Sequence, residues 1–174
     1  MTAEELKKCM RYASTQNVVK YADPITQAML EFGIDTPLRQ AYFLAQLAHE
    51  SGSLQYVCEI ASGGAYEGRT DLGNTDPGDG VKYKGHGLIQ TTGKANHFRV
   101  ADYFDVPRED IVAWLQTPMG AARSAGLFWR DNNLNASADA DDIHKNTRIL
   151  NGGQNGILDR IQRLVETKRG LGVT

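Results

Sequence analysis

Residues 38–50 restrict the fold of this chain more than any other segment. Their apolar members follow a helical period and spread to nearly every side of the helix: Leu38, Ala41, Tyr42, Phe43, Leu44, Ala45, Leu47 and Ala48. Thr36-Pro37 is a helix-start signal, and Ser51-Gly52 ends the pattern. Because a helix that is apolar all round must be surrounded by other elements, we expect this one at the centre of a helical core.

Helix patterns recur on both sides of that segment. Before it, the sequence predicts helices over 3–11 and 24–32, the second with Asp23 as N-cap, Pro24 at its first position and Gly33 at its C-cap. After residue 93 it predicts helices over 97–104, 108–115, 119–132, 139–150 and 157–168, with Ser137 or Asp139 as the cap of the fourth. The last helix is basic and amphipathic, and we expect it to pack on the core rather than lie on a membrane.

Residues 63–93 have no helical period and hold nine of the chain's eighteen glycines. The segment also carries Tyr66, Tyr83, Leu88 and Ile89, which a flexible linker would lack. We therefore predict a long ordered loop with a short hairpin around 81–83. A loop of this length inside a compact domain is usually functional.

Composition excludes several classes of protein. Nineteen basic residues against twenty-one acidic ones give a net charge of −2, which argues against a nucleic-acid partner held through its phosphates. No apolar run approaches the ~20 residues that cross a bilayer, so we expect no stable membrane insertion. The first residues lack the apolar core of a signal peptide, which predicts synthesis in the cytoplasm. Cys9 and Cys58 do not make a disulfide scaffold, and we expect no disulfide between them.

No metal or cofactor motif is complete. His49-Glu50 begins like a zinc-protease helix, but Ser53 stands where the second histidine ligand belongs. Residues 87–94 resemble a phosphate loop whose glycine interval is one residue too long, and Ala95 replaces the hydroxyl residue that would bind magnesium. We therefore expect neither a metal nor a cofactor.

Two carboxylates stand out by their positions. Glu50 ends the apolar helix, where the negative end of the helix dipole and the apolar surroundings both favour its protonated form, as a general acid requires. Glu59 follows the Gly52 turn and can return to face Glu50 across a cleft. Paired acid and base carboxylates are the arrangement of glycoside hydrolysis. Position alone equally allows Glu50 to be a helix-end residue in contact with water.

Three segments carry a resemblance to a known family. FLAQLAHESG (43–52) resembles the catalytic-acid segment of glycoside hydrolase family 19, the chitinases and their lysozyme-like phage relatives. PGDGVKYKGHGLIQTTG (77–93) is similar to the substrate-cleft signature of that family. TRILNGG (147–153), with Asp159-Arg160 downstream, resembles its third block. The segments follow the family order and together cover about residues 38–165, so the combination is specific.

The resemblance implies a role for seven residues. Glu50 matches the general acid, and Glu59 matches the general base of the compact members. Thr92 matches a hydroxyl residue that helps to hold the attacking water. The remaining matches fall in the substrate-binding set, in which the arginine also supports the acid: Gln90, Asn96, Asn151 and Arg160.

Plainer roles remain open for four of these residues. Thr92 and Gln90 can serve only to satisfy loop backbone. Asn151 can serve only to end a helix before Gly152, and Arg160 can be a surface charge.

Glu67 is a rival base, because the long loop can bring it to the cleft. The spacing of the compact members favours Glu59. The chain also departs from the plant chitinases, which have a glutamate where Asn155 stands and an aromatic residue where Ala95 stands.

The resemblance implies a mainly α-helical, lysozyme-like fold with two lobes, a central cleft and the glycine-rich loop as one wall, in a single catalytic domain over 1–174 without a separate binding module. It implies a monomeric endolysin-type hydrolase that cleaves the β-1,4 bond of peptidoglycan with inversion and lyses bacteria. Such an enzyme would reach the wall through a holin-type pore. The alternative is a chitinase acting on β-1,4-linked N-acetylglucosamine. Missing loops would widen the cleft and suit the branched polymer.

Overall fold

The computed structural model describes residues 1–173 and is mainly helical, as predicted. The helices are α1 (Ala3–Cys9), α2 (Thr15–Glu31), α3 (Pro37–Glu50), α4 (Asp79–Lys82), α5 (Lys94–Phe104), α6 (Ile111–Leu115), α7 (Pro118–Asp131), α8 (Leu134–Asp139), α9 (Ile143–Asn151) and α10 (Ile157–Leu171). Two short 3-10 helices, η1 (Gly64–Tyr66) and η2 (Thr70–Leu72), lie in the glycine-rich segment. Within residues 1–173, β-pairing is limited to isolated bridges.

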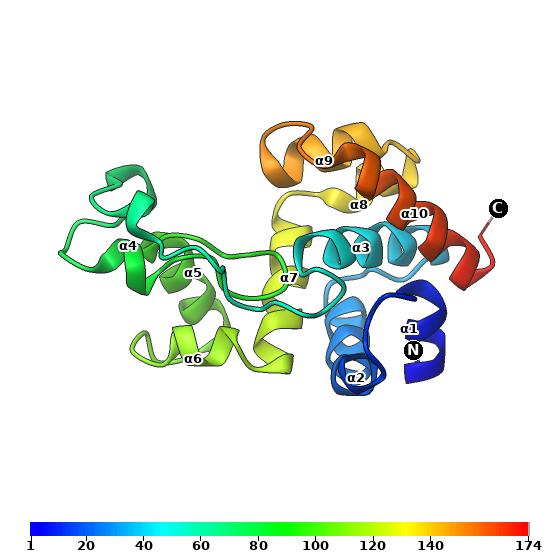
Figure 1. Cartoon of the computed structure of the whole chain (residues 1–174), viewed down its shortest axis with the longest axis horizontal. Helices are drawn as coiled ribbons and strands as arrows, with labels where there is room; N and C mark the ends of the chain where they lie inside the picture. The colour runs from blue at the N-terminus through cyan, green and yellow to red at the C-terminus, as the bar shows by residue number, and fades with distance from the viewer. Residues whose placement is uncertain (174) are drawn as a thin grey trace.

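The apolar helix α3 lies at the centre of the core, as its pattern predicts. Every residue from 41 to 48 is buried. α8, α9 and α10 cover one side of it and α1 and α2 the other (Figure 1). The basic helix α10 packs against both α3 and α1 and buries Leu164, although Leu158 and Val165 on the same helix stay exposed. No helix within residues 1–173 is both long enough and apolar enough to cross a membrane.

Helix α7 stands between two groups of elements. α4, α5 and α6 lie on one side of it, and the core around α3 lies on the other (Figure 1). α7 packs against α2, α6 and α8. Its Trp129 meets Phe43 of α3 edge-on, with ring centroids 5.3 Å apart. α7 therefore fixes how the two lobes face each other.

The start of α2 differs from the prediction. The helix begins at Thr15 with Ser14 as its N-cap, and Pro24 lies in its interior. The Ser14 hydroxyl accepts a hydrogen bond from the Asn17 N–H at 3.1 Å, a cap as good as the Asp23-Pro24 signal. Pro24 cannot donate to the carbonyl of Lys20, but Lys20 is exposed, so water can take that place.

The region after α7 also differs. Residues 134–139 form α8, and α9 begins only at Ile143, so the predicted helix over 139–150 is displaced. The cap of α9 is Asp142, which accepts from the Lys145 N–H at 2.9 Å, and neither Ser137 nor Asp139 fills that role. Asn133 makes the break before α8 with a left-handed backbone, φ 50°.

The predicted hairpin around 81–83 is absent from the described chain. Val81 and Lys82 belong to α4, and Tyr83 follows as its C-cap. The β-bridges instead join Cys58 to His86 and His86 to Thr91. Cys58 and Cys9 are both free.

Candidate active site

Glu50, the last residue of α3, is held by an arginine from α10. Arg160 Nη2 donates to Glu50 Oε1 at 2.5 Å, across 110 positions of sequence. The Glu50 side chain is 18% exposed, whereas that of Arg160 is 3% exposed. The carboxylate therefore reaches solvent while the guanidinium is buried. Arg160 stabilises a negative charge on Glu50, which acts against the helix-end effect considered above.

Neutral acceptors fix the Arg160 guanidinium. Nη1 donates to Gln46 Oε1, and Nε donates to the carbonyl of Asn155 at 3.1 Å. Gln46 is fully buried in α3, and its Nε2 donates to Asn146 Oδ1 at 2.8 Å. The burial of Arg160 rules out its reading as a surface charge, while its place in the substrate-binding set stays a prediction. It positions Glu50, which is the supporting role that the resemblance also implied.

Asn151 closes the turn that follows α9. Its Oδ1 accepts from the Gly153 N–H at 2.9 Å, and its Nδ2 donates to the carbonyl of Asn155 at 3.1 Å. The same carbonyl accepts a hydrogen bond from Arg160 Nε. Asn151 thus ends its helix and steadies the turn behind Glu50, while contact with a sugar stays a prediction.

Glu59 lies in a segment that pairs with residues 85–86. Its N–H donates to the Gly85 carbonyl at 2.8 Å. Tyr66 Oη donates to Glu59 Oε1 at 3.1 Å, and the Gly85 N–H donates to Oε2 at 3.0 Å. Burial, and then the hydrogen bond to Glu59, raise the pKa of Tyr66, so it stays a neutral donor. Among residues 1–173, Glu59 has no ion-pair partner.

Gly85 also brings Gln90 beside Glu59. A Cβ at Gly85 would lie 2.5 Å from Gln90 Oε1 and 3.2 Å from Glu59 Oε2. Thr92 Oγ1 donates to the Gln90 carbonyl at 2.9 Å, and Asn96 Nδ2 donates to the Thr92 carbonyl at 2.8 Å. These bonds satisfy loop backbone, the plainer role. The three side chains also line a common pocket, described below.

The Glu67 carboxylate accepts hydrogen bonds from within its own loop. Its Oε1 accepts from the Gly78 N–H at 2.5 Å, and its Oε2 accepts from the Gly80 N–H at 2.8 Å. These amides stand at the start of α4, where free N–H groups need acceptors. Glu59 also accepts two hydrogen bonds, but it lies beside the pocket residue Gln90, whereas Glu67 lies against the start of α4, so the geometry favours Glu59 over Glu67 as the base.

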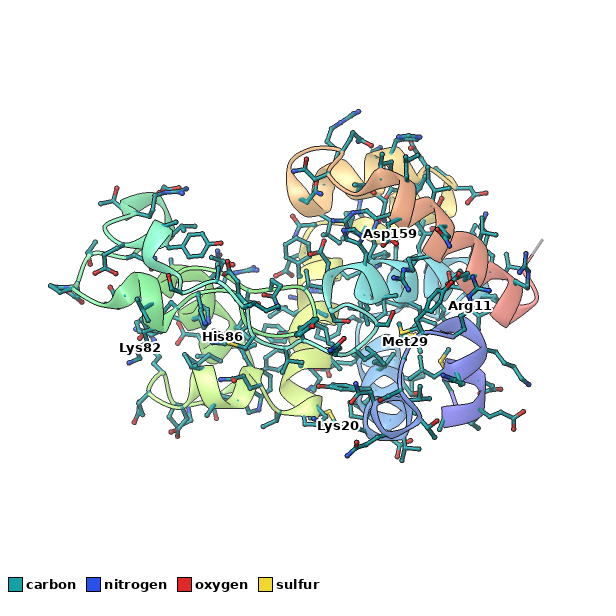
Figure 2. The ribbon with its side chains drawn as sticks, in the orientation of Figure 1. Arg11, Lys20, Met29, Lys82, His86 and Asp159 are labelled. Atoms are coloured by element: carbon teal, nitrogen blue, oxygen red, sulfur yellow. The ribbon has the colours of Figure 1, made fainter. Side chains whose placement is uncertain are left out.

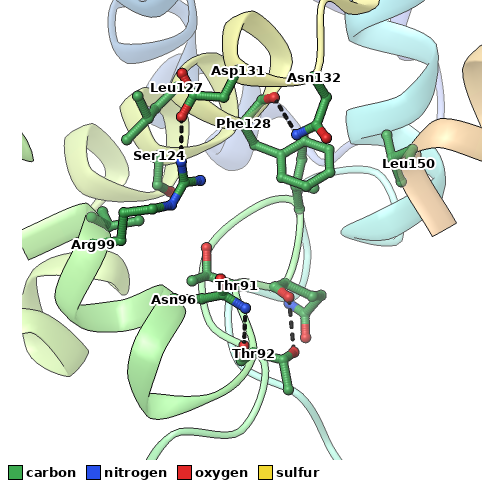
Figure 3. A pocket seen from close by; sticks show the side chains of 13 residues that line it. Thr91, Thr92, Asn96, Arg99, Ser124, Leu127, Phe128, Asp131, Asn132 and Leu150 are labelled. Atoms are coloured by element: carbon green, nitrogen blue, oxygen red, sulfur yellow. Dashed lines mark hydrogen bonds and ion pairs between the residues drawn. The ribbon is translucent and has the colours of Figure 1, made fainter. Parts of the chain in front are cut away.

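A pocket of about 420 Å³ lies where the lobes meet (Figure 3). Its lining side chains come from the 89–92 loop, α5, α7 with its C-cap residue, and α9: Ile89, Gln90, Thr91, Thr92, Asn96, Arg99, Val100, Ser124, Leu127, Phe128, Asp131, Asn132 and Leu150. It thus unites Gln90, Thr92 and Asn96, three of the residues expected at the site. Glu50, Glu59, Asn151 and Arg160 are outside the lining set, although Glu59 adjoins it through Gln90.

His86 and His97 form a buried pair in the same lobe as α4, and Figure 2 labels His86 there. His97 Nδ1 lies 2.8 Å from the Gly93 carbonyl, so it must carry the proton. Its Nε2 then accepts from His86 Nδ1 at 3.0 Å. Burial lowers the pKa of both rings, that of His97 to about 4. The neutral pair joins α5 to the strand-like segment beside Glu59.

A second polar contact lies behind Glu50. His49 Nδ1 is 2.7 Å from Asp159 Oδ2, and Figure 2 shows Asp159 on α10. Burial opposes ionisation of Asp159, but its bond to His49 and the charge of Arg163 lower its pKa.

Sequence reasoning missed several residues of the site. Gln46 gave a signal, because an amide inside an otherwise apolar helix needs a buried partner. Tyr66, the His86–His97 pair and the Arg99–Asp131 pair gave none, since their partners come from other elements.

Comparisons with known proteins agree on one family. No family model matches the chain. Over 161 residues it is 30% identical to a glycosyl hydrolase family 19 domain-containing protein of Haemophilus influenzae, covering 74% of this chain and 78% of that protein. It is 35% identical over 144 residues to an endochitinase of Arabidopsis thaliana, covering 77% of this chain and 48% of the plant protein. The chain thus spans about half the length of that plant relative.

Two solved structures share the fold. Chitinase C of Streptomyces griseus superposes with a TM-score of 0.77 at 20% identity, over 99% of this chain and 77% of that one. A class IV chitinase of Zea mays gives a TM-score of 0.70 at 19% identity, over 96% of this chain and 86% of that one. These matches confirm the mainly helical, lysozyme-like fold class. The Haemophilus relative shows that the chain belongs to glycosyl hydrolase family 19 and is a glycoside hydrolase.

Proposed function

We propose that the chain hydrolyses the β-1,4 bonds of polymers that contain N-acetylglucosamine, by an inverting general acid/base mechanism. Glu50 is the acid and Glu59 the base. The observation that carries this assignment is the different support of the two carboxylates. Glu50 contacts a buried arginine, whereas the donors to Glu59 within the described part of the chain are neutral, Tyr66 and the Gly85 N–H.

The two environments suit the two roles. After Glu50 has given its proton to the leaving oxygen, Arg160 stabilises the carboxylate that remains. Glu59 has no cationic partner within residues 1–173, so no ion pair competes for its carboxylate when it takes a proton from water. Thr92 and Gln90 lie near Glu59. Thr92 is assigned to holding the attacking water, and Gln90 is assigned to contacting the sugar. The remaining assigned sugar contacts are Asn96 and Asn151.

Chitin is the first substrate to test, because plant relatives and solved structural neighbours are named chitinases. Peptidoglycan, the endolysin substrate, is the second, because a positively charged side chain, Arg99, lines the pocket. Both polymers share the bond and the N-acetylglucosamine unit. An endolysin would in addition be released to the cell wall and lyse the bacterium.

The decisive measurement follows the products of chitohexaose and of purified peptidoglycan. NMR during the first turnovers should show the α-anomer at the new reducing end, because inversion converts a β bond to an α product. Mass spectrometry should show N-acetylmuramic acid at the reducing end if peptidoglycan is cut by a muramidase. Initial β-anomer or anhydro-sugar products would overturn the inverting hydrolysis.

Glu50→Gln is the matched inactive variant. It keeps the shape of the side chain and an acceptor for Arg160 but cannot donate the proton. We expect a fall in kcat of at least ~100-fold, with an unchanged melting temperature. A variant that retains most of its activity removes Glu50 from the mechanism.

A further inference from the structure

One corner of the pocket carries an excess of positive charge. Within residues 1–173, Arg99 and Asp131 are the only charged side chains that line it. Arg99 Nη1 donates to Asp131 Oδ2 at 2.5 Å. Arg130 approaches the other oxygen from behind, with Nε and Nη2 at 2.9 and 2.6 Å from Oδ1. One carboxylate therefore serves two guanidiniums, and one positive charge remains in excess.

Asp131 stays ionised in this arrangement. Burial works against its charge, but the hydrogen bonds from Arg130 and Arg99 lower its pKa. Its side chain is 19% exposed, whereas that of Arg99 is 52% exposed. The pair thus holds Arg99 from one side and leaves the guanidinium accessible from the pocket.

The ion pair with Asp131 uses one of the nitrogen donors of Arg99. Its Nε and Nη2 have no hydrogen-bond partner among the described residues. Figure 3 shows the second terminal nitrogen directed toward the open middle of the pocket. A guanidinium that keeps two neighbouring donors free can bind a carboxylate through both of them.

The rest of the pocket suits a sugar. Phe128 and Leu150 provide apolar surface, and Asn96 and Asn132 provide amides. Amides and hydroxyls beside aromatic and aliphatic surface can hold a polar ring. An acidic group attached to a bound sugar would then meet Arg99.

We propose that Arg99 binds a carboxylate on the substrate glycan and so favours an acidic, branched glycan over a neutral one. This rests on the proposed function, because it takes the pocket as part of the sugar-binding cleft. Chitin carries no carboxylate, whereas the peptide branches of peptidoglycan do. Arg99 is therefore a specificity residue, separate from Glu50 and Glu59.

Arg99→Gln tests the role, with Arg130→Gln as the matched control. Both changes remove one guanidinium from Asp131, but Arg130 does not line the pocket. We expect Arg99→Gln to lower kcat/KM on soluble peptidoglycan fragments ~10-fold, the value of one charge-assisted contact. Its activity on chitohexaose should stay within ~2-fold. Arg130→Gln should stay within ~2-fold on both substrates.

A chemical change in the substrate gives an independent test. When the carboxylates of the fragments are converted to amides, wild type and Arg99→Gln should become equal, because no anion remains to bind. An equal loss on both substrates, no loss on either, or a loss that persists on amidated fragments would overturn the proposal. So would a wild-type protein that cleaves chitohexaose but not peptidoglycan.

Binding separates this proposal from the proposed function. Titration of the Glu50→Gln protein with an acidic disaccharide-peptide fragment and its amidated form needs no turnover. If wild type hydrolyses neither polymer, the proposed function fails, and the proposal for Arg99 stands only if the acidic fragment binds ~10-fold tighter and Arg99→Gln removes the difference. Equal binding of the two forms rejects it.

Discussion

Glu59 and Glu67 show how two identical residues in one segment acquire different tasks. Each accepts two hydrogen bonds from neutral donors. Both donors to Glu67 are backbone amides at the start of α4, so its charge compensates a helix end. Glu59 instead lies against Gly85, next to the pocket residue Gln90. Position relative to the pocket, rather than residue type, distinguishes them.

The two glutamates can be separated by kinetics. We expect Glu59→Gln to reduce kcat at least ~100-fold with little change in KM, because the lost interaction belongs to the transition state. Glu67→Gln should keep kcat and lower the melting temperature, because one amide loses its acceptor. Azide should restore turnover to Glu59→Ala and give a glycosyl azide of inverted configuration. A dead Glu67→Gln beside an active Glu59→Gln would transfer the base to the loop.

At the scale of elements, α7 depends on small residues. Its buried positions include Gly120, Ala121, Ala122, Ala125 and Gly126. Small side chains let another helix approach closely, and α2 packs here with Phe32 at its end. The two lobes can therefore share one helix as a common wall, and the pocket forms along it.

Gly126→Ala tests how closely α2 packs against α7. A Cβ at Gly126 would lie 2.3 Å from Phe32 Cδ2, and Phe32 is itself packed against Tyr103 and Phe104. Alanine improves helix propensity by about 1 kcal/mol, but overpacking costs about 1–3 kcal/mol. We expect a net loss of about 1 kcal/mol in the free energy of unfolding.

Gly153→Ala is the control for that change. A Cβ there would meet only Asn151 Oδ1 at 4.0 Å. Chemical denaturation should therefore show an unchanged or slightly higher stability. A Gly126→Ala protein more stable than wild type would mean that α2 and α7 are not closely packed.

At the scale of the whole molecule, folding keeps His97 neutral. Burial lowers its pKa from 6.5 to about 4, against a raising hydrogen bond to Gly93. The unfolded chain binds the proton more readily, so this stabilisation is complete above pH 6.5 and is lost as the pH falls toward 4. A difference of this size amounts to on the order of 3 kcal/mol. His86 acts in the same direction.

The slope of unfolding free energy against pH measures this term. Wild type should lose stability between pH 6.5 and 4, and His97→Gln should show a flatter dependence there. The ion-paired carboxylates, Asp131 and Asp141 among them, have lowered pKa values and act at still lower pH. A wild-type curve that is flat over this window would show that His97 titrates as in the unfolded chain.

The sequence by itself determined the central helix, the carboxylate at its end and the family. Periodicity and residue type are local, and residues 38–50 permit only a buried helix that ends at Glu50. The second motif contained Gln90 and Thr92, and the spacing from Glu50 pointed to Glu59; the roles of these three residues stay predictions. Local signals failed where two caps competed, as at Ser14 and Asp23, because cap chemistry alone does not rank them.

The resemblance named Arg160 as a support of the acid, but only the tertiary structure decided the contacts that support the site. Arg160 meets Glu50 across 110 positions, and Arg99 meets Asp131 across 32. Such contacts depend on how α10 packs on α3 and how α5 stands against α7, which no local pattern encodes. The same holds for Glu67, because its two backbone donors at the start of α4 could be located only in the folded chain.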